Sequence, residues 1–294
     1  MTYYIKHYTD YQYVDTVALS HNLVHLTARG CPGQTCLRHE LEVSIPPAVL
    51  TFQDDFFGNP VTLFTVQVPH RKLSVCAVNE VEVHPAAAPE PMRTVPWEQV
   101  RSTLRADRGA PTLDAYQFTF DSPYISRDEA LGVYASPSFG PGRPLLDAVL
   151  DLTRRIHADF RYDTTATTTA TPLSDVLALR RGVCQDFAHL EIGCLRSLGL
   201  AARYVSGYLL TTPPPGQQRL VGADASHAWL SVYCPPFGWI DVDPTNDQIP
   251  YDRHIVLAWG RDYDDVSPIR GVILGGGPHS VVVGVDVTLI DGSS

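Results

Sequence analysis

The sequence is poor in basic residues and has no apolar run long enough to cross a membrane. Among 294 residues, 22 Lys and Arg stand against 32 Asp and Glu, which gives a formal net charge of -10 at pH 7. Nucleic-acid binding relies on clustered basic side chains, so nucleic acid is not an expected partner. The N-terminus lacks a basic segment followed by an apolar stretch. We therefore expect a cytoplasmic protein that does not associate with a membrane.

Cysteine is also scarce. The six cysteines are too few and too scattered to form a disulfide framework in a chain of this length, so we expect reduced thiols. Cys31 and Cys36 bracket Pro32-Gly33 and can face each other across a turn or share a metal. No second Cys/His pair with ligand spacing accompanies them, so structural or incidental thiols are the better interpretation and no resident metal is expected.

Several common catalytic and binding signatures are missing. The chain contains no HExxH, GxSxG, GxGxxG or P-loop motif, which removes the commonest metal, serine and nucleotide-dependent classes, and we expect no cofactor. What it does contain is 44% hydrophobic residues over 294 positions. That is enough to bury a large core and to form two domains.

The hydrophobic pattern divides the chain into three segments. Short alternating runs up to about Val83 predict an antiparallel β domain over residues 1–90. The Pro-rich stretch 85–91 breaks every period and predicts a linker. Residues 91–268 carry helical periods followed by strands and predict an α+β core. Residues 269–294 contain a strand over 281–289 that can return to either domain.

Helices are predicted on both sides of a Thr-rich stretch. Apolar residues at three- and four-residue spacing indicate an amphipathic helix over 144–160, which begins at a proline. Residues 164–171 have no clear period and are predicted as a loop. Ser174 is predicted to cap a short helix that ends at Gly182.

The segment after Gly182 predicts a buried helix and then strands. A mostly apolar helix begins at Cys184 and ends at Gly199, and its Cys194 is expected to be a small core residue. A Pro-rich loop is expected around 213–216. The predicted strands are 203–209, 227–233 and 239–242.

Cys184 lies at the first turn of the apolar helix. Unpaired backbone N–H groups and the positive end of the helix dipole favour an anion there, and a thiolate is such an anion. With an imidazolium nearby, this position can lower a cysteine pKa from about 8.5 into the range ~3.5–7.5. The same N–H groups can stabilise the oxyanion of a tetrahedral intermediate. A cysteine taken alone is more often a small buried residue, so the nucleophile interpretation depends on its partners.

Two downstream residues can complete the catalytic set. If the segment after Cys234 is a hairpin turn that pairs Cys234 with Gly238, position 227 faces 245, and His227 and Asp243 become diagonal neighbours roughly 7–8 Å apart. A small bulge would then bring their side chains into hydrogen-bond range. The carboxylate would stabilise the imidazolium while His227 moves the thiol proton. Taken singly, His227 reads as a half-buried strand histidine and Asp243 as a turn former.

Other polar residues compete for supporting roles. Asp241 is an alternative orienting carboxylate, but it lies farther along the strand, whereas Asp243 sits against the rigid Pro244. Solvated or supporting positions are expected for Asp186, Gln185 and His189.

Four motifs together resemble the core of the bacterial transglutaminase-like superfamily. They are Gly-Val-Cys-Gln-Asp-Phe-Ala-His (182–189), Ala-Arg-Tyr-Val-Ser-Gly-Tyr (202–208), Ser-His-Ala-Trp (226–229) and Asp-Pro-Thr-Asn (243–246). The stretch Asp-Phe-Phe-Gly-Asn (55–59), with His70 and Val-Glu-Val (81–83), is similar to the β domain that precedes this core in many bacterial members. The segment 260–266 resembles their C-terminal part.

The resemblance implies a papain-like α+β core, in which the cysteine helix packs against an antiparallel sheet that carries the histidine and the aspartate. It assigns the nucleophile to Cys184, the general base to His227 and the orienting acid to Asp243. Papain-type enzymes use a glutamine upstream of the cysteine for the oxyanion, and the matching position is Ala178. The second oxyanion donor therefore stays unassigned. Members of the superfamily include cross-linkers, peptidases and amide hydrolases, so the resemblance leaves the reaction open.

We expect a cysteine peptidase or amidase that forms a thioester with a peptide or protein amide substrate. Hydrolysis is favoured because water is always available, whereas transamidation needs an amine site for which the sequence shows no feature. The alternatives are a protein-glutamine transamidase and a noncatalytic peptide-binding module. The sequence specifies neither the substrate's identity nor the oligomeric state.

Overall fold

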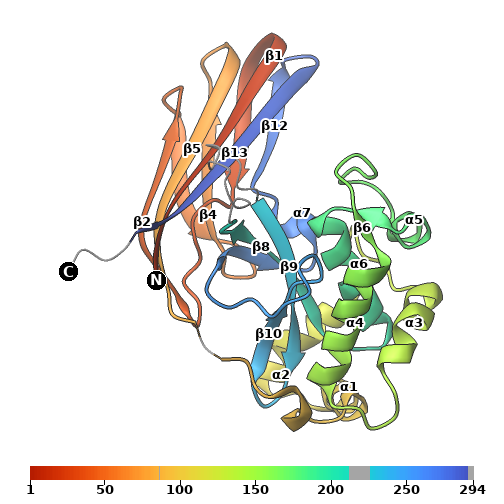
Figure 1. The fold of residues 1–294 in the computed structure, drawn as a ribbon. Helices are drawn as coiled ribbons and strands as arrows, with labels where there is room; N and C mark the ends of the chain where they lie inside the picture. Colours follow the sequence, from red (N-terminus) through yellow and green to blue (C-terminus); the bar gives the residue numbers. More distant parts are fainter. Residues whose placement is uncertain (86, 212–225, 291–294) are drawn as a thin grey trace, which may run out of the picture.

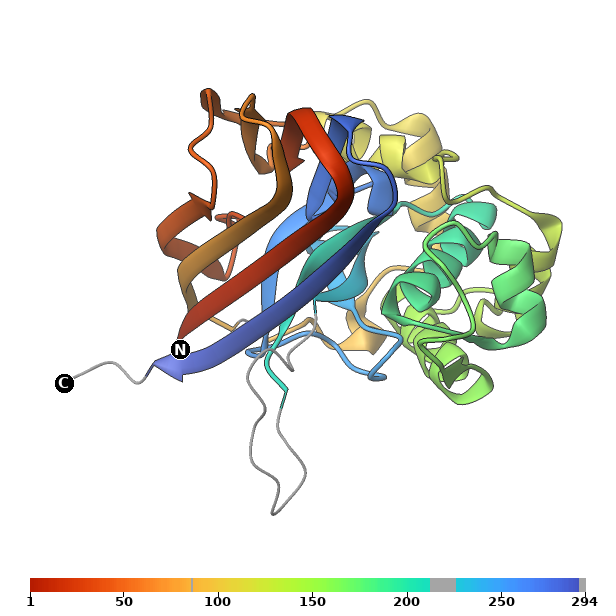
Figure 2. The ribbon, with the colours of Figure 1, turned by 90° about the horizontal axis from the view of Figure 1, so that it is seen from above.

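The computed structural model describes residues 1–85, 87–211 and 226–290, which form a large antiparallel sheet, a smaller sheet and a layer of helices (Figure 1). Seen from above, the smaller sheet lies between the large sheet and the helices (Figure 2). This is the α+β architecture that the sequence predicts. The expected Pro-rich loop around 213–216 lies outside the described residues. No helix in the described ranges is long and apolar enough to cross a membrane.

The large sheet has seven strands and is organised around β1 (Thr2–Val24). Buried and exposed residues alternate along the first part of β1, because one face of the strand packs into the core. One edge of β1 pairs with β5 and β4, and the other with β13 and β12. The remaining strands are β2 (Gln34–Val43), β3 (Val49–Asp54), β4 (Pro60–Val66), β5 (His70–Val83), β12 (Ile269–Gly275) and β13 (His279–Ile290).

The C-terminal strands return to the N-terminal sheet. The strand predicted over 281–289 lies within β13, which runs antiparallel to β1 with Tyr3 opposite Leu289 and Tyr13 opposite His279. The preceding β12 was not predicted. It is joined to β13 through three glycines, all with positive φ, and a side chain at Gly275 would meet the Thr16 carbonyl oxygen at 2.5 Å.

The helical layer contains the predicted helices, together with α1, α2, α3 and α7, which were not predicted. The predicted helix over 144–160 is α4, and its N-cap is Pro144. The expected cap at Ser174 is wrong, since α5 begins at Leu173 after Pro172. The expected stop at Gly182 is wrong as well, because Arg180 ends α5 in the left-handed conformation, with φ of 55°. The helices are α1 (Trp97–Ala106), α2 (Ala110–Tyr116), α3 (Glu129–Ala135), α4 (Leu145–Asp159), α5 (Leu173–Leu179), α6 (Cys184–Ser197) and α7 (Tyr263–Val266).

Helix α6 lies at the centre of the hydrophobic core between the helices and the small sheet. Its residues 185–196 are all buried, as the apolar pattern predicts, and Cys194 is one of them. The helix packs on β9 of a four-stranded antiparallel sheet with the order β10-β9-β8-β11. The strands of this sheet are β8 (Ala202–Leu209), β9 (Ser226–Cys234), β10 (Gly238–Val242) and β11 (His254–Gly260). Two short strands, β6 (Arg161–Tyr162) and β7 (Arg181–Gly182), pair in parallel, and β7 leads into α6.

The opposite face of the small sheet packs on the large one. Tyr208, Ile255 and Leu257 belong to the hydrophobic core of the N-terminal sheet.

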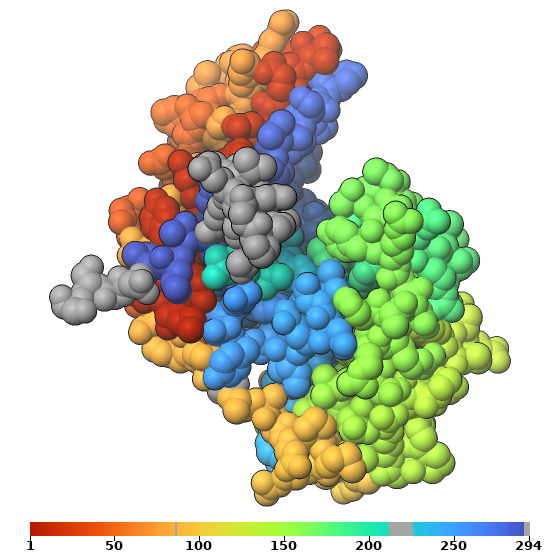
Figure 3. All heavy atoms as spheres, in the orientation of Figure 1, coloured from red at the N-terminus to blue at the C-terminus, as the bar shows by residue number. Residues whose placement is uncertain are grey.

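In the space-filling view, the surface is notched between strands β12 and β13 on one side and the segment around β6 and α5 on the other (Figure 3).

Side-chain amides from the large sheet cover the outer edge of β11. Gln34 accepts a hydrogen bond from the Val256 N–H at 2.8 Å and donates one to the Val256 carbonyl at 2.8 Å. Asn59 does the same for Trp259, at 2.9 and 2.8 Å. Each carboxamide stands in for the peptide group of a neighbouring strand, so the edge of the small sheet is satisfied only when the large sheet is in place.

Candidate active site

Cys184 is the first residue of α6 and is partly exposed. The turn before it is held by Asp186, whose Oδ2 accepts hydrogen bonds from the Val183 N–H at 2.8 Å and from the Thr167 hydroxyl at 2.6 Å. A side chain at Gly182 would lie 2.5 Å from that same carboxylate oxygen. Glycine at 182 is therefore required for the close approach that places the thiol at the helix start.

His227 lies near the start of β9 and contacts Asp243. The predicted hairpin is confirmed, with Gly238 opposite Cys234, but its pairing ends at Val242. The expected position of 227 opposite 245 is wrong, because the chain leaves the ladder at Asp243, which pairs with Gln248 instead. This turn brings Asp243 Oδ2 to 2.8 Å from His227 Nε2.

The Asp243 carboxylate is fully buried and saturated with donors. Its Oδ1 accepts from the backbone N–H groups of Thr245 and Asn246, at 3.0 and 3.3 Å. Its Oδ2 accepts from the Asn246 side chain at 2.7 Å, from His227, and from His254 at 3.0 Å. Burial alone raises the pKa of Asp243. The hydrogen bonds from the two histidines outweigh burial and hold this pKa well below its usual range.

His227 has Cys184 as its second partner. Because Nε2 is turned to Asp243, Nδ1 is the ring nitrogen that remains for the thiol. Burial lowers the pKa of His227, but the hydrogen bonds with Asp243 and Cys184 outweigh it and raise the pKa to about 10. The imidazole is therefore held in its cationic form beside a sulfur atom, which is the pairing that favours a thiolate.

Asp241 has a different role from Asp243. Its carboxylate accepts a hydrogen bond from the Trp229 indole N–H at 2.9 Å and another from the Ser231 hydroxyl. The Trp229 ring in turn stacks beside His227, with ring centres 5.9 Å apart. Asp241 thus anchors the aromatic wall of the site and orients no catalytic group directly.

The three secondary residues next to Cys184 have structural contacts. Asp186 caps the helix, and Gln185 reaches the Thr169 carbonyl at 3.4 Å. His189 is buried and accepts from the Tyr263 backbone N–H at 3.1 Å. Burial lowers the pKa of His189 to about 3, so this imidazole is a neutral acceptor.

Several residues around the site were not predicted from the sequence. Asn246 lies in the quoted Asp-Pro-Thr-Asn motif, but no role was assigned to it. His254 opens β11, a strand that was not predicted although the apolar run 255–259 signals one. Tyr162 and Tyr204 lie close to Cys184. Burial raises the pKa of each, and the charge of Cys184 adds to the effect.

His227, Asp243 and His254 are also close enough together to offer three ligand atoms to a metal ion. The same atoms are already hydrogen bonded to one another, and these bonds account for their proximity.

Comparison with known proteins gives family matches for both halves of the chain. Residues 3–82 match the bacterial transglutaminase-like N-terminal region, and residues 135–244 match the transglutaminase-like superfamily. An uncharacterized protein of Mycobacterium tuberculosis is 43% identical over 302 residues, covering 99% of this chain and 94% of that protein. A protein-glutamine gamma-glutamyltransferase of Pseudomonas aeruginosa is 33% identical over 99 residues, covering 31% of this chain and 15% of that protein.

A solved structure has the same fold. The crystal structure of a candidate cysteine protease from Cytophaga hutchinsonii superposes with a TM-score of 0.78 at 23% identity. The match covers 100% of this chain and 92% of that one.

Proposed function

Because the chain belongs to the transglutaminase-like superfamily, a family of cysteine-dependent enzymes, we propose that it cleaves amide bonds through Cys184, His227 and Asp243. The observation that carries this proposal is the buried pair of His227 Nε2 and Asp243 Oδ2, 2.8 Å apart, with the helix-start thiol of Cys184 on the other side of the imidazole. These groups supply a nucleophile, a proton carrier and an orienting carboxylate.

In the proposed reaction, the Cys184 thiolate attacks the amide carbon of the substrate. The carbonyl oxygen becomes an oxyanion, which the unpaired N–H groups at the start of α6 stabilise. His227 gives its proton to the leaving nitrogen as the C–N bond breaks, and a thioester remains on Cys184. His227 then takes a proton from water, whose oxygen attacks the thioester; the C–S bond breaks, the carboxylic acid is released, and the Cys184 thiolate and the His227 imidazolium are restored.

Transamidation is the second candidate, and one observation favours it. The Pseudomonas relative that matches part of this chain is named a protein-glutamine gamma-glutamyltransferase. In that reaction an amine would replace water in attacking the thioester, while the first half of the mechanism would be unchanged.

The intact set of three catalytic groups argues against a noncatalytic peptide-binding module.

The experiment is to incubate the purified full-length chain with glutamine-containing peptides, with and without a fluorescent primary amine. Hydrolysis predicts peptide cleavage or ammonia release that does not depend on the amine, and transamidation predicts amine incorporation. The Cys184→Ala variant is the control. Turnover that persists in this variant would contradict the proposal.

A further inference from the structure

His254 donates a hydrogen bond to the same oxygen of Asp243 that holds His227, and the proposed mechanism assigns it no role. Its Nε2 lies 3.0 Å from Asp243 Oδ2, and its side chain is 4% exposed. It reaches this oxygen from β11, whereas His227 reaches it from β9. The two strands lie on either side of β8.

The rings of His227, Trp229 and His254 pack against one another. The Trp229 ring stands edge-on to His254 at 5.1 Å and stacks on His227 at 5.9 Å. The Trp229 indole fits because β8, the strand between β9 and β11, has glycine at position 207. A side chain there would meet the Trp229 ring at 2.5 Å. His254 is therefore packed in one orientation by Trp229, with its Nε2 turned to the carboxylate.

The other nitrogen of His254 fixes its tautomer. Nδ1 is buried and has no hydrogen-bond partner among the described residues. A proton on Nδ1 would be an unpaired donor away from water, which is costly, whereas a proton on Nε2 has Asp243 as its acceptor. The arrangement selects the tautomer that donates from Nε2.

Asp243 Oδ2 is crowded as a result. A carboxylate oxygen offers about two lone-pair directions, yet Oδ2 receives hydrogen bonds from His227, His254 and Asn246. Donors that share one acceptor compete for its charge. The N–H of His254 therefore weakens the hold of Asp243 on the imidazolium of His227 and also pins the carboxylate in place.

We propose that His254 is a positioning residue that fixes Asp243 against His227 and limits how tightly the carboxylate holds the imidazolium proton. This inference rests on the proposed function. An imidazolium that is held too tightly is a poor acid toward a leaving amine, so the second histidine would keep His227 able to release its proton. The charged groups that act on His227 are Asp243 and Cys184. The buried Glu191 interacts with Asp243, and burial raises the pKa of Glu191 to about 8, so this carboxyl keeps its proton at neutral pH.

The test measures the rate of Cys184 alkylation by iodoacetamide against pH in the full chain. His254→Phe keeps a ring but removes the donor, and His254→Gln keeps a donor near the position of Nε2. In His254→Phe, we expect the upper transition, where His227 loses its proton, to move up by on the order of half to one pH unit. His254→Gln should stay near the wild type. His7→Phe, which replaces a buried histidine of the large sheet, is the matched control and should not move the transition.

A double-variant cycle shows whether His254 acts through Asp243. The shift caused by His254→Phe should vanish in an Asp243→Asn background. An unmoved transition in folded His254→Phe, equal shifts for Phe and Gln, or a shift that survives Asp243→Asn would each overturn the inference. If wild-type Cys184 shows no enhanced reactivity at all, the proposed catalytic set fails first, so the two failures are distinguishable.

Discussion

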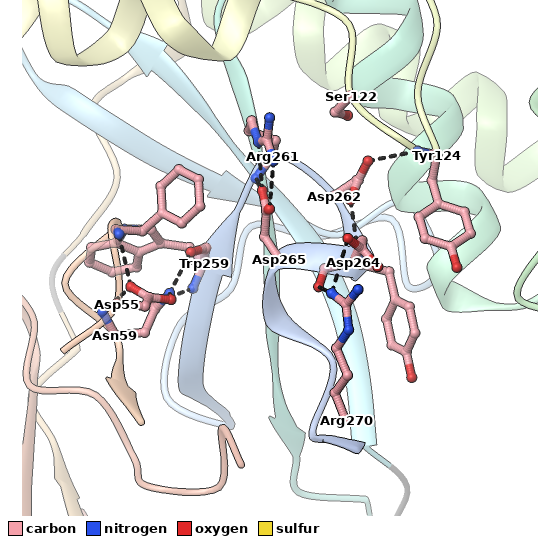
Figure 4. Close-up of polar contacts among 12 residues, drawn as sticks. Asp55, Asn59, Ser122, Tyr124, Trp259, Arg261, Asp262, Asp264, Asp265 and Arg270 are labelled. Carbon is pink, nitrogen blue, oxygen red and sulfur yellow. Dashed lines mark hydrogen bonds and ion pairs between the residues drawn. The ribbon is translucent and has the colours of Figure 1, made fainter. Parts of the chain in front are cut away.

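The buried Asn59 carboxamide and the network around Asp243 differ in how completely their polar atoms are paired. At the junction of the two sheets, both polar atoms of the Asn59 carboxamide make two hydrogen bonds each, and Trp259 supplies one partner to each atom (Figure 4). Nearby, Arg261 holds Asp265 through two side-chain bonds at 2.8 Å. The network around Asp243 instead ends in a partly exposed thiol and an unpaired nitrogen of His254.

The difference separates stability from reactivity. A carboxamide whose polar atoms all have partners resists opening, because breaking any of its hydrogen bonds leaves a buried group unsatisfied. A network that ends at a thiol has one group free to react, and its charges are arranged around that group. We therefore expect variants at the junction to change stability and variants at the site to change turnover.

The largest effect is expected for Cys184→Ala. Turnover should fall by roughly a hundredfold or more, because the nucleophile is removed. The melting temperature should change little, since the residue is only partly buried. The matched control is Cys76→Ala in the large sheet, which should keep full activity. A Cys184→Ala protein that turns over at the wild-type rate would contradict the assignment of Cys184 as the nucleophile.

Asp243→Asn and Asp241→Asn test which of the two carboxylates near the end of β10 orients His227. The amide at 243 can still orient His227 but cannot stabilise its cation, so we expect a loss of roughly tenfold or more in kcat/KM. Asp241→Asn should cost much less, because Asp241 contacts Trp229 and Ser231. A larger loss at 241 in folded protein would show that the orienting carboxylate is misassigned.

Asn59→Ala tests the junction. The variant leaves the Trp259 N–H and carbonyl without partners in a buried site, which should cost about 1–3 kcal/mol of unfolding free energy. Folded protein should keep its activity. Gln53→Ala on the exposed strand β3 is the control. Equal denaturation midpoints for the two variants would show that the carboxamide bridge does not hold the sheets together.

Glu191 in α6 has a buried carboxyl that is only half paired. One oxygen accepts a hydrogen bond from the Thr153 hydroxyl, and the other has no hydrogen-bond partner among the described residues. Burial raises the pKa of Glu191 from 4.5 to about 8. Between these values the unfolded chain loses the proton while the native protein keeps it, so this group lowers stability as pH rises.

Glu191→Gln should remove that dependence. Its stability relative to the wild type should increase by up to roughly 1 kcal/mol per pH unit between pH 5 and 8, as measured by urea unfolding. The exposed Glu129→Gln is the control. Parallel stability curves for Glu191→Gln and the wild type would contradict the assigned pKa.

Local patterns predicted much of this arrangement, and contacts between distant strands explain the rest. The start of α6 at Cys184 and the hairpin that pairs Cys234 with Gly238 follow from helix and turn signals. The role of His254 could not be predicted, because it depends on β11 lying beside β8, which no local pattern specifies. The predicted pairing of 227 with 245 fails because the chain turns at Asp243. This turn is stabilised by hydrogen bonds of Asp243 with Asn246 and with the two histidines, which come from other strands.

The most direct test of the account compares the alkylation rates of the six cysteines at pH 6–7 by peptide mapping. Burial raises the pKa of each of the other five thiols. We expect Cys184 to react fastest and His227→Ala to remove this advantage, because the thiolate depends on the imidazolium. Even labelling of all six thiols, or an advantage of Cys184 that survives His227→Ala, would contradict it.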